Sequence, residues 1–156
     1  MPEDRADRHP ASAATCSVEA AAPCSAKTRA ATSRILARLR TASVRGDYLA
    51  EDVVIEWPFA AGGPRRVEGR AAFVAMAGPG RAALPFRFDE LTVDAVHETA
   101  DPEVIVAEYR LGGTIKATGE RRSSALISVI RVRDDRVTHW REYQDTLAIA
   151  QAMTPS

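Results

Sequence analysis

The residues that could do chemistry gather near the C-terminus of the sequence, in the stretch 137–145. Side chains of a strand alternate between two faces, so Trp140, Glu142 and Gln144 would share one face. If that face lines an apolar cavity, burial beside Trp140 disfavours the charged form of Glu142 and raises its pKa toward neutral pH. Such a carboxyl group can act as a general acid or base. If the face is solvated instead, Glu142 would pair with an arginine, and the strand period alone allows both arrangements.

Two hydroxyl groups could assist this carboxyl group. Tyr109 could donate a hydrogen bond to a developing oxyanion, or it could be a packed aromatic residue. Ser128 follows the strand period of Leu126 and Ile130, so its hydroxyl would lie on an apolar face. There it could donate to a substrate oxygen or be satisfied by a backbone carbonyl.

Apolar side chains could form the walls of a substrate cavity. Trp57 and Phe59 stand two residues apart and would share a strand face, as a stacking surface or as core. Phe73 and Met76 would share a helix face, as cavity wall or as core. The other candidate substrate-binding residues are Leu126, Trp140 and Gln144.

Several other kinds of site are not indicated by the sequence. Residues 62–64 lack the Lys-Ser/Thr of a phosphate loop, and there is no G-x-S-x-G motif. The three histidines lack the spacing of zinc ligands, and both cysteines lie within the first 24 residues. We therefore expect neither a metal ion nor a cofactor.

Composition limits the classes of partner. The 156 residues contain 21 basic and 21 acidic side chains, which argues against nucleic acid and against a polybasic membrane anchor. No apolar run approaches the length of a membrane span. Residues 1–24 are small and polar, which predicts a flexible tail without a secretion signal and hence a cytoplasmic protein. One domain is expected over 25–152.

The elements that would position these residues follow from period and turn signals. Strands are predicted over 52–59, 85–98, 103–112, 114–132 and 136–146. Helices are predicted over 25–46, 69–78 and 146–153, with Pro79-Gly80 ending the second. Turns are predicted at 60–66, 100–102 and 134–135, with a bend at 112–113 and Asp52 as a turn or cap residue. This order predicts an α+β fold with helices on one face of a long antiparallel sheet.

Two stretches of the sequence carry a family resemblance. WREYQD after the hairpin RVRDDRVTH, and YLAEDVVIEWPF followed by VEGRAAF, resemble the nuclear transport factor 2-like superfamily. Its most similar branches are the SnoaL-like polyketide cyclases and limonene epoxide hydrolase, over roughly 25–150. The resemblance implies a cone, in which a curved antiparallel sheet wraps around N-terminal helices and encloses an apolar pocket, and it implies a homodimer.

The resemblance also bears on single residues. Glu142 falls where these two branches place a catalytic aspartate. Trp57 stands where ketosteroid isomerase has its base, and Ser128 stands where that enzyme has an oxyanion aspartate and the cyclases often have a histidine. The Arg and second Asp of limonene epoxide hydrolase fall near Tyr109 and Leu111, so that triad is incomplete here.

The same register places a second set of residues on the outer, dimer-facing side of the sheet. Glu108 and Arg110 share a face with Val104 and Val106, where they are expected to form a structural ion pair. The two histidines of the strands, His97 and His139, are expected at the surface or interface.

Two functions from different classes follow. The first is a cofactor-independent enzyme in which Glu142 acts as general acid/base. It would catalyse cyclisation, isomerisation, dehydration or epoxide opening of a hydrophobic polyketide- or terpenoid-like intermediate in a biosynthetic pathway. The alternative is a non-catalytic ligand-binding or dimerisation module on the same fold.

Overall fold

The structure is a computed structural model that describes Ala30 and residues 46–153. The tail predicted over 1–24, and all of the helix predicted over 25–46 except Ala30 and Gly46, lie outside the described residues.

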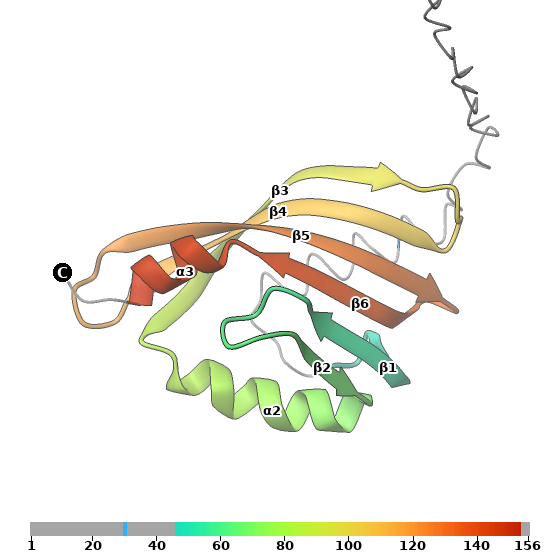
Figure 1. Cartoon of the computed structure of the whole chain (residues 1–156), viewed down its shortest axis with the longest axis horizontal. Coiled ribbons are helices and arrows are strands. Elements are labelled where there is room, and N and C mark those ends of the chain that lie inside the picture. Colours follow the sequence, from blue (N-terminus) through green and yellow to red (C-terminus); the bar gives the residue numbers. More distant parts are fainter. Residues whose placement is uncertain (1–29, 31–45, 154–156) are drawn as a thin grey trace, which may run out of the picture.

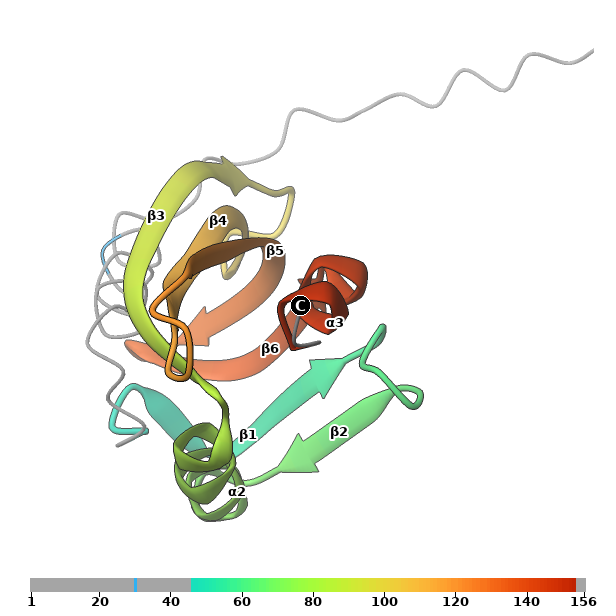
Figure 2. The same cartoon turned by 90° about the vertical axis from the view of Figure 1, so that its left-hand side faces the viewer.

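A curved six-stranded sheet dominates the described part of the chain (Figures 1 and 2). The strand order is β2-β1-β6-β5-β4-β3. All neighbours are antiparallel except β1 and β6, which pair in parallel, so the expected antiparallel sheet is in fact mixed. The strands are β1 (Leu49–Trp57), β2 (Arg65–Glu68), β3 (Phe86–Glu98), β4 (Val104–Ile115), β5 (Arg121–Arg133) and β6 (Arg136–Gln144).

Two helices accompany this sheet, α2 (Arg70–Ala83) and α3 (Thr146–Met153). Helix α2 packs against β1 and β2, and α3 packs against β5 on the inner side of the curve (Figure 2). Asp145 caps α3, because its carboxylate accepts the Ala148 N–H at 2.9 Å. The α+β fold with a curved sheet is therefore confirmed. None of the described helices is long and apolar enough to cross a membrane.

The inner face of the sheet carries the core. In β5, burial alternates strictly, and Leu126, Ser128, Ile130 and Val132 point inward. The larger core cluster contains Tyr48, Leu49, Val53, Ile55, Phe73, Ile105, Ile130, Val132, Val137 and Trp140. A smaller cluster contains Leu91, Ala107, Tyr109 and Leu126. Ser128 thus occupies a position that the strand period reserves for an apolar residue.

A β-bulge in β6 sets the direction of the chemically interesting side chains. Arg131 pairs with His139 and Val132 with Val137, so Thr138 is an extra residue on β6. Val137 and Trp140 can therefore both be buried although they lie three residues apart. Beyond the bulge the alternation resumes and turns Glu142 inward, which is one of the two arrangements that the strand period allows.

Two strand boundaries differ from the prediction. Gly112 and Gly113 do not form a bend but lie inside β4, and the turn comes later, at Lys116–Glu120. A Cβ on Gly113 would lie 2.1 Å from the carbonyl oxygen of Arg87 on β3. The glycine thus allows a close approach of two strands, which a single sequence does not distinguish from a turn.

The region around α2 also differs from the prediction. Arg65 and Arg66, predicted as turn, begin the edge strand β2, because they pair with the end of β1. Helix α2 continues through Pro79 to Ala83. Proline removes one backbone donor, but Pro79 and Ala75 are both exposed, so water can satisfy the freed carbonyl. Asp52, expected as a turn or cap residue, lies inside β1.

The outer face of the sheet carries charged pairs that run between strands. Glu108 accepts from His97 at 2.8 Å, and Arg110 donates to Asp94 at 2.7 Å. The predicted Glu108–Arg110 pair is therefore wrong, since each residue finds a partner on the neighbouring strand β3.

Candidate active site

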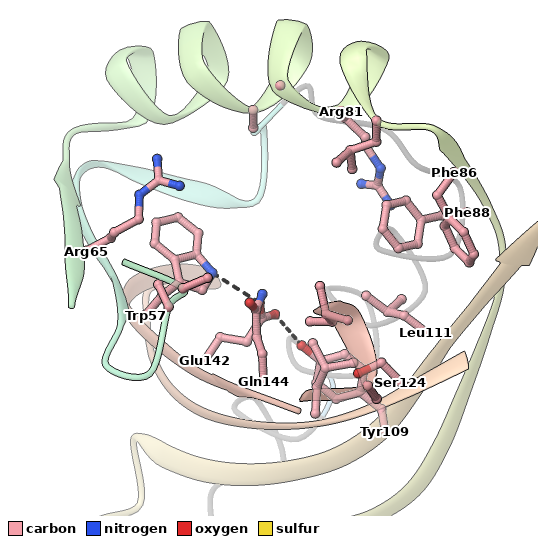
Figure 3. Close-up of a pocket in the computed structure, with 18 of the residues that line it drawn as sticks. Trp57, Arg65, Arg81, Phe86, Phe88, Tyr109, Leu111, Ser124, Glu142 and Gln144 are labelled. Carbon is pink, nitrogen blue, oxygen red and sulfur yellow. Dashed lines mark hydrogen bonds between the residues drawn. The ribbon is translucent and has the colours of Figure 1, made fainter. Parts of the chain in front are cut away.

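A cavity of about 630 Å³ lies between helix α2, the inner face of the sheet and α3 (Figure 3). Its walls are mostly apolar and aromatic, as is usual for small-molecule sites. Eight of the predicted site residues line it, namely Trp57, Phe73, Met76, Tyr109, Leu126, Trp140, Glu142 and Gln144. Residues from β1, α2, β4, β5 and β6 thus meet at one site.

The Glu142 carboxylate is the central polar group of this cavity. The residue is 8% exposed. Its Oε1 accepts hydrogen bonds from the Trp57 indole N–H at 3.1 Å and from the Gln144 amide at 2.7 Å. Its Oε2 accepts the Tyr109 hydroxyl at 2.5 Å. Three donors therefore offset the loss of hydration, and no arginine takes part among the described residues.

A chain of buried donors stands behind Tyr109. The Trp140 indole N–H donates to the Ser128 hydroxyl oxygen at 2.8 Å, and the Ser128 and Tyr109 hydroxyls are 3.0 Å apart. Because the Tyr109 proton is used on Glu142, Ser128 must donate to the Tyr109 oxygen. Burial, and next the negative charge of Glu142, raise the pKa of Tyr109 well above its ordinary value. Tyr109 thus remains a hydrogen-bond donor.

The hydrogen-bond geometry leaves Glu142 with capacity for a substrate. A carboxylate has about four acceptor positions. Two are used at Oε1 and one at Oε2, counting donors within the described residues. The remaining position on Oε2 can accept a proton from a molecule in the cavity, or a hydrogen bond from a hydroxyl group of that molecule.

Two predicted site residues lie elsewhere. Ser128 is fully buried and does not line the cavity, so it can reach a substrate only through Tyr109. Phe59 is 65% exposed and packs edge-on against Tyr143, with ring centres 5.4 Å apart. The prediction that Phe59 shares a face with Trp57 is wrong, because β1 ends at Trp57 and alternation stops there.

Other lining residues were missed from the sequence. Helix α2 contributes Gly80 and Arg81, which continue the spacing of Phe73 and Met76, and its C-cap residue Leu84 also lines the cavity. That signal is present in the sequence, but the helix was expected to end at Pro79. Phe86 and Phe88, which the sequence leaves open between core and cavity wall, also line the cavity. The remaining missed lining residues are Tyr48, Ala60, Ala61, Arg65, Ala77, Leu111, Arg122, Ser123, Ser124, Ala148 and Ile149.

The cavity does not offer a metal-binding set within the described residues. Over 46–153, no three His, Cys, Asp or Glu side chains form a group that could hold a metal ion. The charged groups of the lining are Glu142 and the three arginines Arg65, Arg81 and Arg122.

Comparison with known proteins agrees with this geometry. Residues 29–140, most of the chain, match the family model of the SnoaL-like domain. The chain belongs to this SnoaL-like family. The predicted resemblance to the SnoaL-like proteins is thereby confirmed.

Individual relatives of this SnoaL-like domain come from several bacteria. The uncharacterised protein YesE of Bacillus subtilis (strain 168) is 31% identical over 103 residues, 65% of this chain and 69% of YesE. The crystal structure of a candidate isomerase from Bacillus subtilis is similar with a TM-score of 0.68 and 27% identity, over 81% of this chain and 91% of that one. A candidate SnoaL-like polyketide cyclase from Jannaschia sp. CCS1 has a TM-score of 0.65 and 18% identity, over 88% and 99% of the chains. At 18% identity this last likeness shows the fold.

Proposed function

We propose that this SnoaL-like domain is a cofactor-independent enzyme in which Glu142 is the general acid/base. The supporting observation is a buried carboxylate in an apolar cavity, with three donors and one open acceptor position on Oε2. The substrate would be a hydrophobic polyketide- or terpenoid-like intermediate. The reaction would be its cyclisation, isomerisation, dehydration or epoxide opening.

The proposed chemistry uses Glu142 and Tyr109 together. Glu142 Oε2 accepts a proton from the carbon next to a substrate carbonyl and returns it to another atom of the same molecule. Protonation removes the charge that holds the Tyr109 hydroxyl at 2.5 Å. Tyr109 can then donate to the oxyanion that develops on the substrate. Apolar walls exclude water and hold the intermediate in a reactive conformer.

Substitution of Glu142 tests this proposal. We expect Glu142→Gln to lower the rate by about 10²–10⁴-fold, because the amide cannot take the proton. The measurement is deuterium uptake from solvent into hydrophobic β-keto esters, together with ring opening of terpenoid epoxides, followed by NMR. Glu142→Asp should keep part of the activity, since it retains a carboxylate.

A matched control is Glu108→Gln, an equal change in a half-exposed carboxylate on the outer face. It should react like the wild type. A wild-type rate in Glu142→Gln would overturn the assignment. Binding of the test compounds without any reaction would favour the alternative, a ligand-binding module. The homodimer and the cytoplasmic location stay predictions of the sequence.

A further inference from the structure

Arg81 stands out among the charged residues of the cavity. It lies in the last turn of α2, on the face that lines the cavity, and its side chain points inward in Figure 3. Its guanidinium carbon lies 4.7 Å from the centre of the Phe88 ring. The partly buried Arg81 guanidinium, stacked on Phe88, can thus contact a molecule in the cavity.

The Arg81 guanidinium has no carboxylate partner among residues 46–153. The two other arginines of the lining differ from it. Arg122 pairs with Glu120 at 2.8 Å, and Arg65 is exposed and donates to the Met76 sulfur at 3.4 Å. Glu142 acts on Arg81 only through space, without an ion pair within 4.0 Å. Arg81 therefore has guanidinium donors inside the cavity that no carboxylate of the described residues accepts.

The surroundings make this arrangement costly without a ligand. Burial lowers the pKa of Arg81, although an arginine stays charged at neutral pH. The Phe88 ring face offsets part of the lost hydration but provides no hydrogen-bond acceptor. A planar anion could fill the guanidinium fork with two parallel hydrogen bonds.

We propose that Arg81 binds a carboxylate group of the substrate, so that the substrate class is a hydrophobic carboxylic acid. This inference rests on the proposed function for the meaning of "substrate", but the binding itself does not. The carboxylate would lie on Arg81 against Phe88, and the apolar body would extend along Phe73, Trp57 and Trp140 toward Glu142. Arg81 would also offset the repulsion between an anionic ligand and the Glu142 carboxylate.

Binding of matched acids and amides tests the proposal. Trp57 and Trp140 are the two tryptophans of the chain, and both line the cavity, so tryptophan fluorescence reports its occupancy. The probes are phenylbutyrate and decanoate, each compared with its primary amide. We expect the wild type to bind at least one acid about tenfold or more tightly than its amide. Arg81→Gln should lose that preference and bind the amide unchanged.

Additional variants make the outcome specific. Arg81→Lys keeps the charge without the planar fork and should show an intermediate preference, which covers the case that Arg81→Gln folds poorly. Arg87→Gln removes an exposed arginine outside the cavity and should keep the full preference. Glu142→Gln should tighten binding of the acid a few-fold and leave the amide unaffected.

Opposite results separate this proposal from the proposed function. The absence of an acid preference in the wild type for every probe pair, or its persistence in Arg81→Gln, overturns the role of Arg81. Loss of the preference in Arg81→Gln supports it even if no test compound reacts. A rate that depends on Glu142 in a protein without acid preference would support the proposed function alone.

Discussion

The three hydrogen bonds to the Glu142 carboxylate come from side chains on three different strands. Trp57 is the last residue of β1, Tyr109 lies in the middle of β4, and Gln144 is the last residue of β6. Behind them, Ser128 joins the Trp140 indole to the Tyr109 oxygen. Because each group of this hydrogen-bond network bonds to the next one, removal of one side chain leaves a buried polar atom with a hydrogen bond missing.

Ser128→Ala is the sharpest test of this network. The substitution leaves the buried Trp140 N–H without an acceptor and the buried Tyr109 oxygen without its donor, so we expect the free energy of unfolding to fall by about 1–3 kcal/mol. Urea denaturation measures the change. Ser123→Ala, an exposed serine on the same strand, should change stability by less than about 0.5 kcal/mol. Equal effects of the two substitutions would contradict a stabilising role of the Ser128 hydrogen bonds.

Two irregularities shape the strands that hold the site. The bulge at Thr138 turns both Val137 and Trp140 inward, and the glycines of β4 let β3 approach closely. The registers of β3 and β4 shift next to these glycines, between Phe88 and Glu90. Phe86 and Phe88 lie beside this shift, and both line the cavity.

Gly113→Ala tests the close approach of β3 and β4. The new methyl group would meet backbone at 2.1 Å, so one strand must move, and we expect a loss of at least about 2 kcal/mol. Gly78→Ala in α2 is the control, because nothing lies within 4 Å of its added Cβ. It should stabilise the helix by about 0.5–1 kcal/mol. Thermal unfolding of both variants decides the point, and a tolerated Gly113→Ala would contradict the geometry.

Across the whole molecule, one carboxylate ties three strands together on the outer face. Glu56 on β1 accepts from His139 at 2.7 Å and Arg141 at 2.9 Å on β6, and from Arg66 at 2.9 Å on β2. Hydrogen bonds from His139 and then Arg141 are the main causes that lower the pKa of Glu56 to about 2.

This cluster predicts how stability responds to acid. A carboxylate whose pKa falls on folding stabilises the protein above its unfolded pKa, near 4.5, and this stabilisation is lost as the pH falls toward 2. The contribution at neutral pH is at most about 3 kcal/mol, less what water and salt screen. Thermal unfolding between pH 7 and pH 2 should show a steeper loss for the wild type than for Glu56→Gln. Parallel curves would contradict the role of Glu56.

The sequence predicted much of this molecule because most of the signals are local. Strand alternation correctly placed Trp140, Glu142 and Gln144 on one face, and Asp134-Asp135 formed the predicted hairpin with positive φ at both residues. The misplaced features depend on distant backbone. Gly113 lies against the backbone of β3, and Phe59 packs against Tyr143 of β6. The parallel pairing of β1 with β6 joins residues that are far apart in the sequence. Arg81 was missed because Pro79 was expected to end the helix, whereas α2 continues to Ala83.

The parallel pairing of β1 with β6 also bears on when the site is completed during folding. Strands β3 to β6 each pair with the next strand in the sequence. Strand β1 instead pairs with β6, which is far away in the sequence, and Val54 lies opposite His139. Closing so long a segment costs more entropy than pairing neighbouring strands, so we expect this pairing to form after the others. Trp57 reaches Glu142 only through this closure. During synthesis, the segment from Trp57 through Gln144 must therefore leave the ribosome before the Glu142 carboxylate gains all three of its hydrogen-bond donors.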